Sequence, residues 1–221
     1  ERKARIEAEK GAWEQELAAW THEIDPFSLE IAKDSKLMHP RQMLRELEKA
    51  MPRHAMVSTD IGNICSVSNS YLRFDEPRSM FAAMSFGNCG YAFPVICGAK
   101  VACPDRPAIA YVGDGAWGIS LNELLTCARE KIGVTVVVFN NGQWGAEKHV
   151  DFYSRRFQGV NLESPSWAKV AQAFGCAGVT VERLADVGPA LQAAVRAQAD
   201  GTCTVLEMMV TQELGDPFRR D

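Results

Sequence analysis

The sequence predicts an α/β fold: a doubly wound, mostly parallel sheet with helices on both faces. Short unbroken apolar runs rich in β-branched residues, such as residues 134–139, alternate with segments of helical length. Two of these runs end directly in turns rich in glycine and asparagine, at residues 113–115 and 140–142. Strands that alternate with helices and lack a polar face are typical of a parallel sheet covered on both sides.

The first half of the chain alternates as this fold requires. We expect a helix over 39–49, with Pro40 in its first turn, and a short strand over 55–59. A glycine-punctuated turn leads into an apolar helix over 91–103, which Pro104 ends. Between the strand over 55–59 and the helix over 91–103 we expect a helix over 64–73 and a strand over 80–83.

The second half repeats the alternation more regularly. Apolar strands over 108–112 and 134–139 flank a helix over 120–131, and the stretch 143–165 is expected to be irregular. The remaining expected elements are a helix over 166–174, a strand over 179–182, a helix over 187–199 and a strand over 202–210.

The N-terminal 24 residues are dense in charge, and a glycine at position 11 interrupts their pattern. Their main apolar residues are Ile6, Trp13, Leu17 and Trp20. This pattern predicts an amphipathic helix or helix pair that packs onto a neighbour. We expect residues 1–38 to be a helical connector from an upstream domain and residues 39–221 to form the main domain. The chain opens with Glu1 rather than Met, so we expect its start to have been cut from something longer.

Composition excludes several classes of function. The 221 residues are 47% hydrophobic and 24% charged, with a formal net charge of −4 and no basic stripe, which argues against a nucleic-acid or membrane-surface binder. The apolar runs are too short to cross a bilayer. The seven cysteines form no Cys-x-x-Cys pair, so we expect them to be reduced, mostly core residues of a cytoplasmic protein.

Three polar turns are expected at one edge of the sheet. Ligands of parallel sheets bind at the carboxyl ends of the strands, and the turns at 60–63, 113–116 and 140–143 lie there. Their backbone N–H groups and side-chain oxygens could surround one anionic group.

A dinucleotide site is the first alternative for this edge, because residues 113–118 match G-x-G-x-x-G. Such a site also needs an acidic residue at the end of the next strand for the ribose, and that strand ends in Asn140 and Asn141. The carboxylate of Asp114 would moreover repel a pyrophosphate unless a cation lay between them. The sequence therefore argues against a nicotinamide or flavin dinucleotide.

A magnesium ion accounts for the same residues better. Asp114 offers a carboxylate oxygen, Asn141 an amide oxygen and Gln143 a backbone carbonyl, and diphosphate oxygens with a water would complete an octahedron. Each residue also has a simpler interpretation. Asp114 could cap a helix, and residues 140–142 could form only a tight turn.

The segment Gly113-Asp114-Gly115, followed by twenty-four residues and then Asn140-Asn141, resembles the signature of the thiamine diphosphate enzymes related to acetolactate synthase and pyruvate oxidase. The resemblance implies that residues 39–221 are a thiamine diphosphate-binding domain. It implies that Asp114, Asn141 and the Gln143 carbonyl hold Mg²⁺. The residues it assigns to the cofactor's diphosphate are Ile61, Gly62, Asn63, Ile64, Gly113, Gly115 and Ala116.

The segment 87–90 resembles the part of this family that meets the aminopyrimidine ring. The resemblance implies that the Gly87 carbonyl accepts from the exocyclic amine and that the Cys89 N–H bonds a ring nitrogen. Many relatives carry Met or another large apolar residue where this chain has Cys89. Its thiol could be taken for a nucleophile, but we favour a packing role.

Longer phrases resemble one branch of the family, the sulfoacetaldehyde acetyltransferases, from about residue 56 to the end. They are Ser58-Thr-Asp-Ile-Gly-Asn63, Met84-Ser-Phe-Gly-Asn-Cys-Gly-Tyr91, Gln143-Trp-Gly-Ala-Glu-Lys148 and residues 213–221. This resemblance implies an acyltransferase that converts sulfoacetaldehyde and phosphate to acetyl phosphate and sulfite. The alternatives are half of an acetolactate synthase-, pyruvate oxidase- or sulfopyruvate decarboxylase-like enzyme, and a non-catalytic domain that binds magnesium and phosphate.

The resemblance also implies groups outside this chain. The glutamate that activates the cofactor would come from a pyrimidine-binding domain of the facing subunit, in a homodimer or homotetramer.

Arg155 and Arg156 are candidates for binding the anionic substrates, as are the arginines at 219 and 220. Glu123 is more simply explained by the helix dipole, and His149, near the irregular stretch, is a secondary candidate for contact with substrate.

Overall fold

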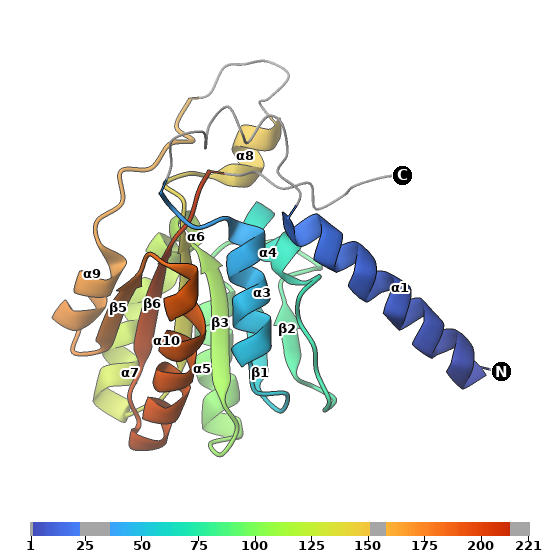
Figure 1. Ribbon diagram of the computed structural model, residues 1–221. Helices are drawn as coiled ribbons and strands as arrows, with labels where there is room; N and C mark the ends of the chain where they lie inside the picture. Colours follow the sequence, from blue (N-terminus) through green and yellow to red (C-terminus); the bar gives the residue numbers. More distant parts are fainter. Residues whose placement is uncertain (1, 23–35, 151–157, 213–221) are drawn as a thin grey trace.

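The computed structural model describes residues 2–22, 36–150 and 158–212, and its centre is a six-stranded sheet (Figure 1). The strands lie in the order β2-β1-β3-β4-β6-β5, and every pair of neighbours is parallel. They are β1 (Met56–Thr59), β2 (Met80–Ala82), β3 (Ala108–Gly113), β4 (Thr135–Asn140), β5 (Ala177–Val181) and β6 (Thr204–Met209). The prediction of a doubly wound parallel α/β fold is confirmed.

The strand order explains where a ligand can enter. From β1 the chain places β2 on one side and β3 on the other, so the direction of winding reverses between β1 and β3. Crevices of this kind form outside the carboxyl ends of the strands at such a reversal. The turns after β1, β3 and β4 lie at this edge.

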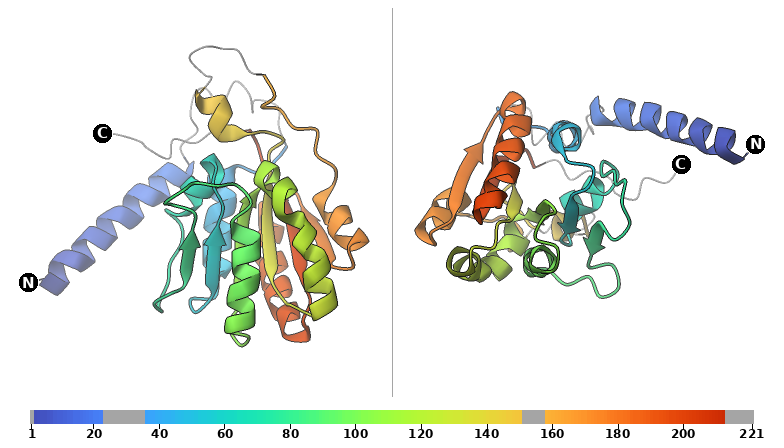
Figure 2. Two further views of the ribbon diagram at one scale, coloured as in Figure 1. Left: turned by 180° about the vertical axis from the view of Figure 1, so that it is seen from behind. Right: turned by 90° about the horizontal axis from the view of Figure 1, so that it is seen from below.

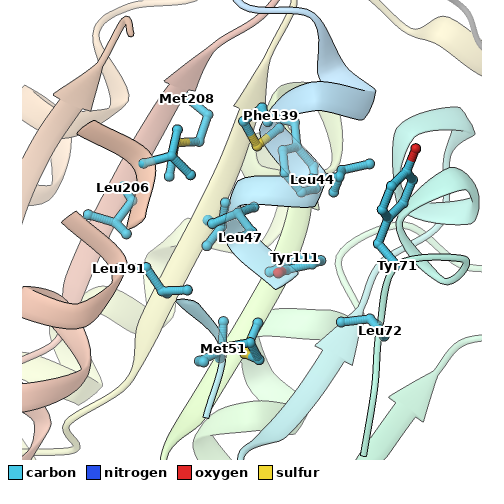
Figure 3. Packing of buried hydrophobic residues seen from close by; sticks show 14 of the residues in the cluster. Leu44, Leu47, Met51, Tyr71, Leu72, Tyr111, Phe139, Leu191, Leu206 and Met208 are labelled. Atoms are coloured by element: carbon cyan, nitrogen blue, oxygen red, sulfur yellow. The ribbon is translucent and has the colours of Figure 1, made fainter. Parts of the chain in front are cut away.

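Two helical layers cover the sheet (Figure 2). Helices α3 (Pro40–Ala50) and α10 (Leu184–Ala197) pack on one face, where Leu44, Leu47 and Leu191 meet the sheet residues Tyr111 and Phe139 (Figure 3). Helices α5 (Ala92–Ala102), α7 (Leu124–Glu130) and α9 (Trp167–Ala173) cover the other face. Central strands buried on both sides explain their unbroken apolar runs.

The structure corrects three of the expected elements. Helix α6 (Asp114–Ser120) begins directly after β3, so residues 113–115 are not a free turn, and a short 3₁₀ turn at 121–123 separates α6 from α7. A helix, α8 (Gly145–Val150), lies in the stretch expected to be irregular. Helix α4 (Asn63–Ser68) is shorter than 64–73, and the Ser68 hydroxyl bonds the Cys65 carbonyl at 2.6 Å in its last turn.

The N-terminal segment is one continuous helix, α1 (Arg2–His22), rather than a helix pair. Its second half packs against the main body. Leu17 is 1% exposed, Trp20 stacks on Tyr71 with ring centroids 6.1 Å apart, and Arg41 of α3 lies 5.2 Å above the Trp20 ring. The division at residue 38 stays a prediction. Among the described residues, no helix has both the length and the apolar character needed to cross a membrane.

Candidate functional site

The three turns at the carboxyl edge of the sheet converge on one pocket. The pocket brings together most of the residues that the sequence assigned to cofactor and metal. Its lining consists of Ile61, Gly62, Asn63, Cys65, Cys89, Gly113, Asp114, Gly115, Ala116, Asn141, Gln143, Trp144, Gly145, Ala146 and Glu147.

Four predicted site residues are not placed at the pocket. Gly87 is exposed, with φ of +75°, and does not line it, so its contact with the aminopyrimidine stays a prediction. The side chain of Ile64 is not described. Arg155 and Arg156 lie outside the described residues, as do the arginines at 219 and 220.

Asp114 is the buried acid of the pocket, with 1% of its surface exposed. Its Oδ2 accepts hydrogen bonds from the Gly142 N–H at 3.0 Å and from the Ser164 hydroxyl at 3.4 Å. These bonds join the end of β3 to the turn after β4. The helix cap position is held by Gly113, so capping does not explain Asp114.

Burial raises the pKa of the Asp114 carboxyl to about 6, against backbone hydrogen bonds from Gly142 and Gly115 that lower it. Among the ion pairs of the described residues, none involves Asp114. A buried carboxylate without a basic partner is costly unless a cation neutralises it. The residue therefore fits a metal ligand.

Asn141 and Gln143 lie across the pocket from Asp114, in the turn after β4. The Asn141 Oδ1 accepts from the Gln143 N–H at 3.2 Å, and Gly142 between them has φ of +65°. The Gln143 side chain turns toward the C-terminal segment, where its Nε2 donates to the Gln212 carbonyl at 3.2 Å. With Asp114, this turn supplies the carboxylate, amide and carbonyl oxygens that suit Mg²⁺.

Trp144 is a pocket residue that the sequence analysis missed. A Cβ at Gly115 would lie 2.9 Å from the ring atoms of Trp144, so the ring fits only over a glycine. The Trp144 N–H donates to the Val160 carbonyl at 2.7 Å, which fixes the start of α8. Its place directly after the asparagine-rich turn was the signal that could have found it.

Asp60 is the second buried acid at this edge, 3% exposed, and it was also missed. It follows β1 directly, as Asp114 follows β3. Its carboxylate accepts from the N–H groups of Ile61 at 2.9 Å, Gly90 at 3.0 Å and Ala92 at 2.8 Å. The predicted diphosphate turn and the predicted aminopyrimidine segment are therefore joined through one side chain.

The Cys89 thiol has the properties of a packing residue. Burial, followed by the charges of Asp60 and Glu147, raises the pKa of this thiol, so it stays protonated at neutral pH. Of the other cysteines, Cys103 is exposed and five are buried: Cys65, Cys97, Cys127, Cys176 and Cys203.

The two remaining polar candidates gain no catalytic role. The Glu123 carboxylate accepts from the Thr126 hydroxyl at 2.9 Å in the first turn of α7, which agrees with a helix-start role. Glu123 does not line the pocket. The side chain of His149 is not described.

The family described as "Thiamine pyrophosphate enzyme, C-terminal TPP binding domain" matches residues 60–208, which run from the buried acid after β1 into the last strand. The chain belongs to this family. The cofactor of this family is thiamine diphosphate. The prediction drawn from the Gly-Asp-Gly and Asn-Asn segments is confirmed at this level.

Relatives and solved structures extend the comparison. The chain is 64% identical over 229 residues to a sulfoacetaldehyde acetyltransferase of Castellaniella defragrans and 61% identical over 228 residues to one of Alcaligenes xylosoxydans xylosoxydans. These alignments cover 100% and 98% of the chain but 38% of each relative. A thiamine diphosphate-dependent 4-hydroxybenzoylformate decarboxylase of Rhodococcus jostii RHA1 has the same fold, with a TM-score of 0.74 and 23% identity, over 80% of this chain and 33% of that one.

Proposed function

We propose that this chain is the C-terminal, diphosphate-binding part of a thiamine diphosphate-dependent sulfoacetaldehyde acetyltransferase, which converts sulfoacetaldehyde and phosphate to acetyl phosphate and sulfite. The identity of 64% along the whole chain to a relative of that name carries the proposal. The full-length enzyme is this chain together with the segment, expected upstream, that completes the length of its relatives.

Within the pocket, Mg²⁺ would be held by Asp114, Asn141 and the Gln143 carbonyl, and its charge would offset that of the cofactor's diphosphate. Nothing lies within 4 Å of a Cβ position at Gly62, which leaves room for the diphosphate to approach the backbone there, whereas the Trp144 ring lies over Gly115 and closes one side of the pocket. Thiamine diphosphate, when bound, supplies a nucleophilic carbon that adds to a carbonyl and stabilises the resulting carbanion. The residues of this chain bind and orient the cofactor.

The rest of the active site would come from outside these residues. The chain spans about 38% of the length of the two relatives, and the activating glutamate would lie on the pyrimidine-binding domain of the facing subunit. The enzyme would be a cytoplasmic homodimer or homotetramer. Arg155 and Arg156 remain candidates for binding the sulfonate or phosphate of the substrates.

An acetolactate synthase-like activity is the second candidate, since the chain is 30% identical over 176 residues to an acetolactate synthase of Mycobacterium bovis. The test supplies the full-length enzyme with Mg²⁺ and thiamine diphosphate, and either sulfoacetaldehyde with phosphate or pyruvate alone. We expect sulfite and acetyl phosphate in equal amounts from the first mixture and no acetolactate from the second. Acetolactate from pyruvate, without sulfite release, would favour the second candidate.

A further inference from the structure

Asp60 occupies a position between two walls of the cofactor pocket. It follows β1, and its own N–H donates to the Tyr111 carbonyl of β3 at 2.9 Å, so the residue is fixed to the centre of the sheet. From there its carboxylate reaches across thirty residues of sequence to the Gly90 N–H and thirty-two to the Ala92 N–H. The Ile61 N–H, at the start of the diphosphate turn, bonds the same Oδ1 atom as Gly90.

The segment that Asp60 holds has no comparable support from its own side chains. Gly87 and Gly90 have φ of +75° and +84°, and Tyr91, at the cap position of α5, makes no side-chain cap hydrogen bond. The carboxylate of Asp60 therefore accepts from the first N–H of α5, at Ala92, and from the Gly90 N–H just before the helix, in place of a local cap. Its negative charge suits the positive end of an eleven-residue helix.

Burial of the Asp60 carboxylate costs free energy, because its charged form loses contact with water. Burial raises the pKa of Asp60, backbone hydrogen bonds from Ala92, Ile61 and Gly90 lower it in part, and no ion pair among the described residues involves it. A polar side chain at position 91 could cap the helix without the free-energy cost of burying a carboxylate. Such a local cap would not link the helix to the turn at 61–63.

We propose that Asp60 is a positioning residue for thiamine diphosphate. Its carboxylate fixes the aminopyrimidine segment 87–90 against the diphosphate turn 61–63. The proposal rests on the proposed function and on the contact of segment 87–90 with the aminopyrimidine, which the family resemblance predicts. Asp60 does not line the pocket. It sets the spacing between the backbone groups that would contact the aminopyrimidine and the diphosphate, so that both ends of the cofactor are held at once.

The test compares two probes on the full-length enzyme, thiamine diphosphate and inorganic pyrophosphate, each titrated with Mg²⁺. Asp60→Asn keeps one oxygen for the Ile61 and Gly90 N–H groups but places an amide NH₂ against the Ala92 N–H. We expect its affinity for thiamine diphosphate to fall about tenfold, and that of Asp60→Ala to fall further, since each leaves buried donors without acceptors. The affinity for pyrophosphate, which lacks the ring, should change less than about threefold.

Gln198→Ala is the matched control for lost stability. Gln198 is 5% exposed and also bonds backbone of a neighbouring segment, at the Ala108 N–H (3.0 Å) and carbonyl (2.9 Å), but at the opposite edge of the sheet. We expect its affinity for both probes to equal that of the unchanged enzyme. Equal losses for both probes in Asp60→Asn, or no loss for either, would overturn the proposal.

A second measurement needs no cofactor. Amide hydrogen exchange of the cofactor-free enzyme should be faster at Ala92 in Asp60→Asn, faster at both Gly90 and Ala92 in Asp60→Ala, and unchanged in both variants at Gly142, which bonds Asp114 instead. Unchanged exchange at Gly90 and Ala92 in Asp60→Ala would contradict the positioning role even if every variant folds. An enzyme that binds thiamine diphosphate but releases no sulfite would refute the proposed reaction and leave this inference standing.

Discussion

At the scale of single residues, the pocket depends on two acids that each follow a strand and are almost fully buried. Asp114 bonds the turn after β4, and Asp60 bonds the segment before α5. Both accept backbone N–H groups rather than ion-pair partners among the described residues. Each acid therefore joins two parts of the pocket wall, but only Asp114 lies on the pocket surface, where a metal ion can reach it.

Replacing Asp114 tests the metal site directly. In the full-length enzyme, Asp114→Asn should lower the Mg²⁺-dependent affinity for thiamine diphosphate about 10- to 100-fold, because the charged ligand is lost. The fold should persist, since the Asn oxygen can still accept from Gly142. Calorimetric titration measures the affinity, and circular dichroism monitors the fold. Asp105→Asn, an exposed acid at the other edge, is the control, and equal affinities in all three proteins would refute the metal assignment.

Glu207 is a third buried acid, 2% exposed, with a structural task. It accepts from the Trp167 and Ala168 N–H groups at the start of α9 and from the Asn140 amide. Burial raises its pKa, but these hydrogen bonds outweigh burial, so the pKa lies below the ordinary 4.5. A lowered folded-state pKa gives stability that is present above about pH 4.5 and is lost as the pH falls through the folded value.

Glu207→Gln should therefore reduce the free energy of unfolding at pH 7, by about 1–3 kcal/mol, and the difference from the unchanged chain should shrink below pH 4.5. Urea unfolding at both pH values measures this difference, once circular dichroism has shown that both chains are folded. A deficit that grows on acidification would show that the carboxylate is not held in its charged form.

At the scale of elements, close packing of backbone against backbone explains one glycine of β5. A Cβ at Gly178 would overlap the Ala168 carbonyl of α9, so this strand and helix approach as closely as they do only because position 178 has no side chain. Gly178→Ala should destabilise the chain by about 1–3 kcal/mol. Gly11→Ala is the contrasting variant, because nothing lies within 4 Å of its Cβ position in α1.

In Gly11→Ala we expect the opposite sign, a gain of about 0.5–1 kcal/mol in helix stability, since alanine restricts the unfolded chain and favours the helix. Thermal unfolding followed by circular dichroism compares the two variants. Destabilisation by both, or by neither, would contradict the packing account of Gly178.

The elements also show which features local sequence can predict. Strands such as β3 and β4 were predicted within one or two residues, because a strand buried on both faces must be an unbroken apolar run. Helices α6 and α8 were not. Both are short, and α8 is held by contacts across the chain, such as the Trp144 N–H to the Val160 carbonyl and the Trp144 ring over Gly115.

The candidate site likewise contains residues that the sequence could predict and residues that it could not. Asp114, Asn141 and Gln143 could be predicted, because strand ends in a parallel sheet meet at one edge and because their spacing resembles a known signature. The role of Asp60 could not, because its partners Gly90 and Ala92 are thirty or more residues away and no local pattern shows that they bond this side chain. The residues that line the pocket follow from topology, whereas those that hold its walls together depend on through-space hydrogen bonds.

At the scale of the whole molecule, this chain would supply half of an active site. Under the proposed function, its pocket would provide the metal ligands and one wall of the cofactor site, and the sequence offers no residue that resembles the activating glutamate of the family. Without that proton transfer and without a facing domain to exclude water, the cofactor would lack the positioned charges that catalysis needs.

The division of the active site is tested by measuring sulfite release from sulfoacetaldehyde. The isolated chain and the full-length enzyme are compared under saturating Mg²⁺, thiamine diphosphate and phosphate. Circular dichroism first establishes that the isolated chain is folded. We predict release by the full-length enzyme, none by the folded chain alone, and recovery when the upstream segment is added in trans. Turnover by the isolated chain within about a hundredfold of the full-length enzyme would contradict the account, because a general base would then lie within these 221 residues.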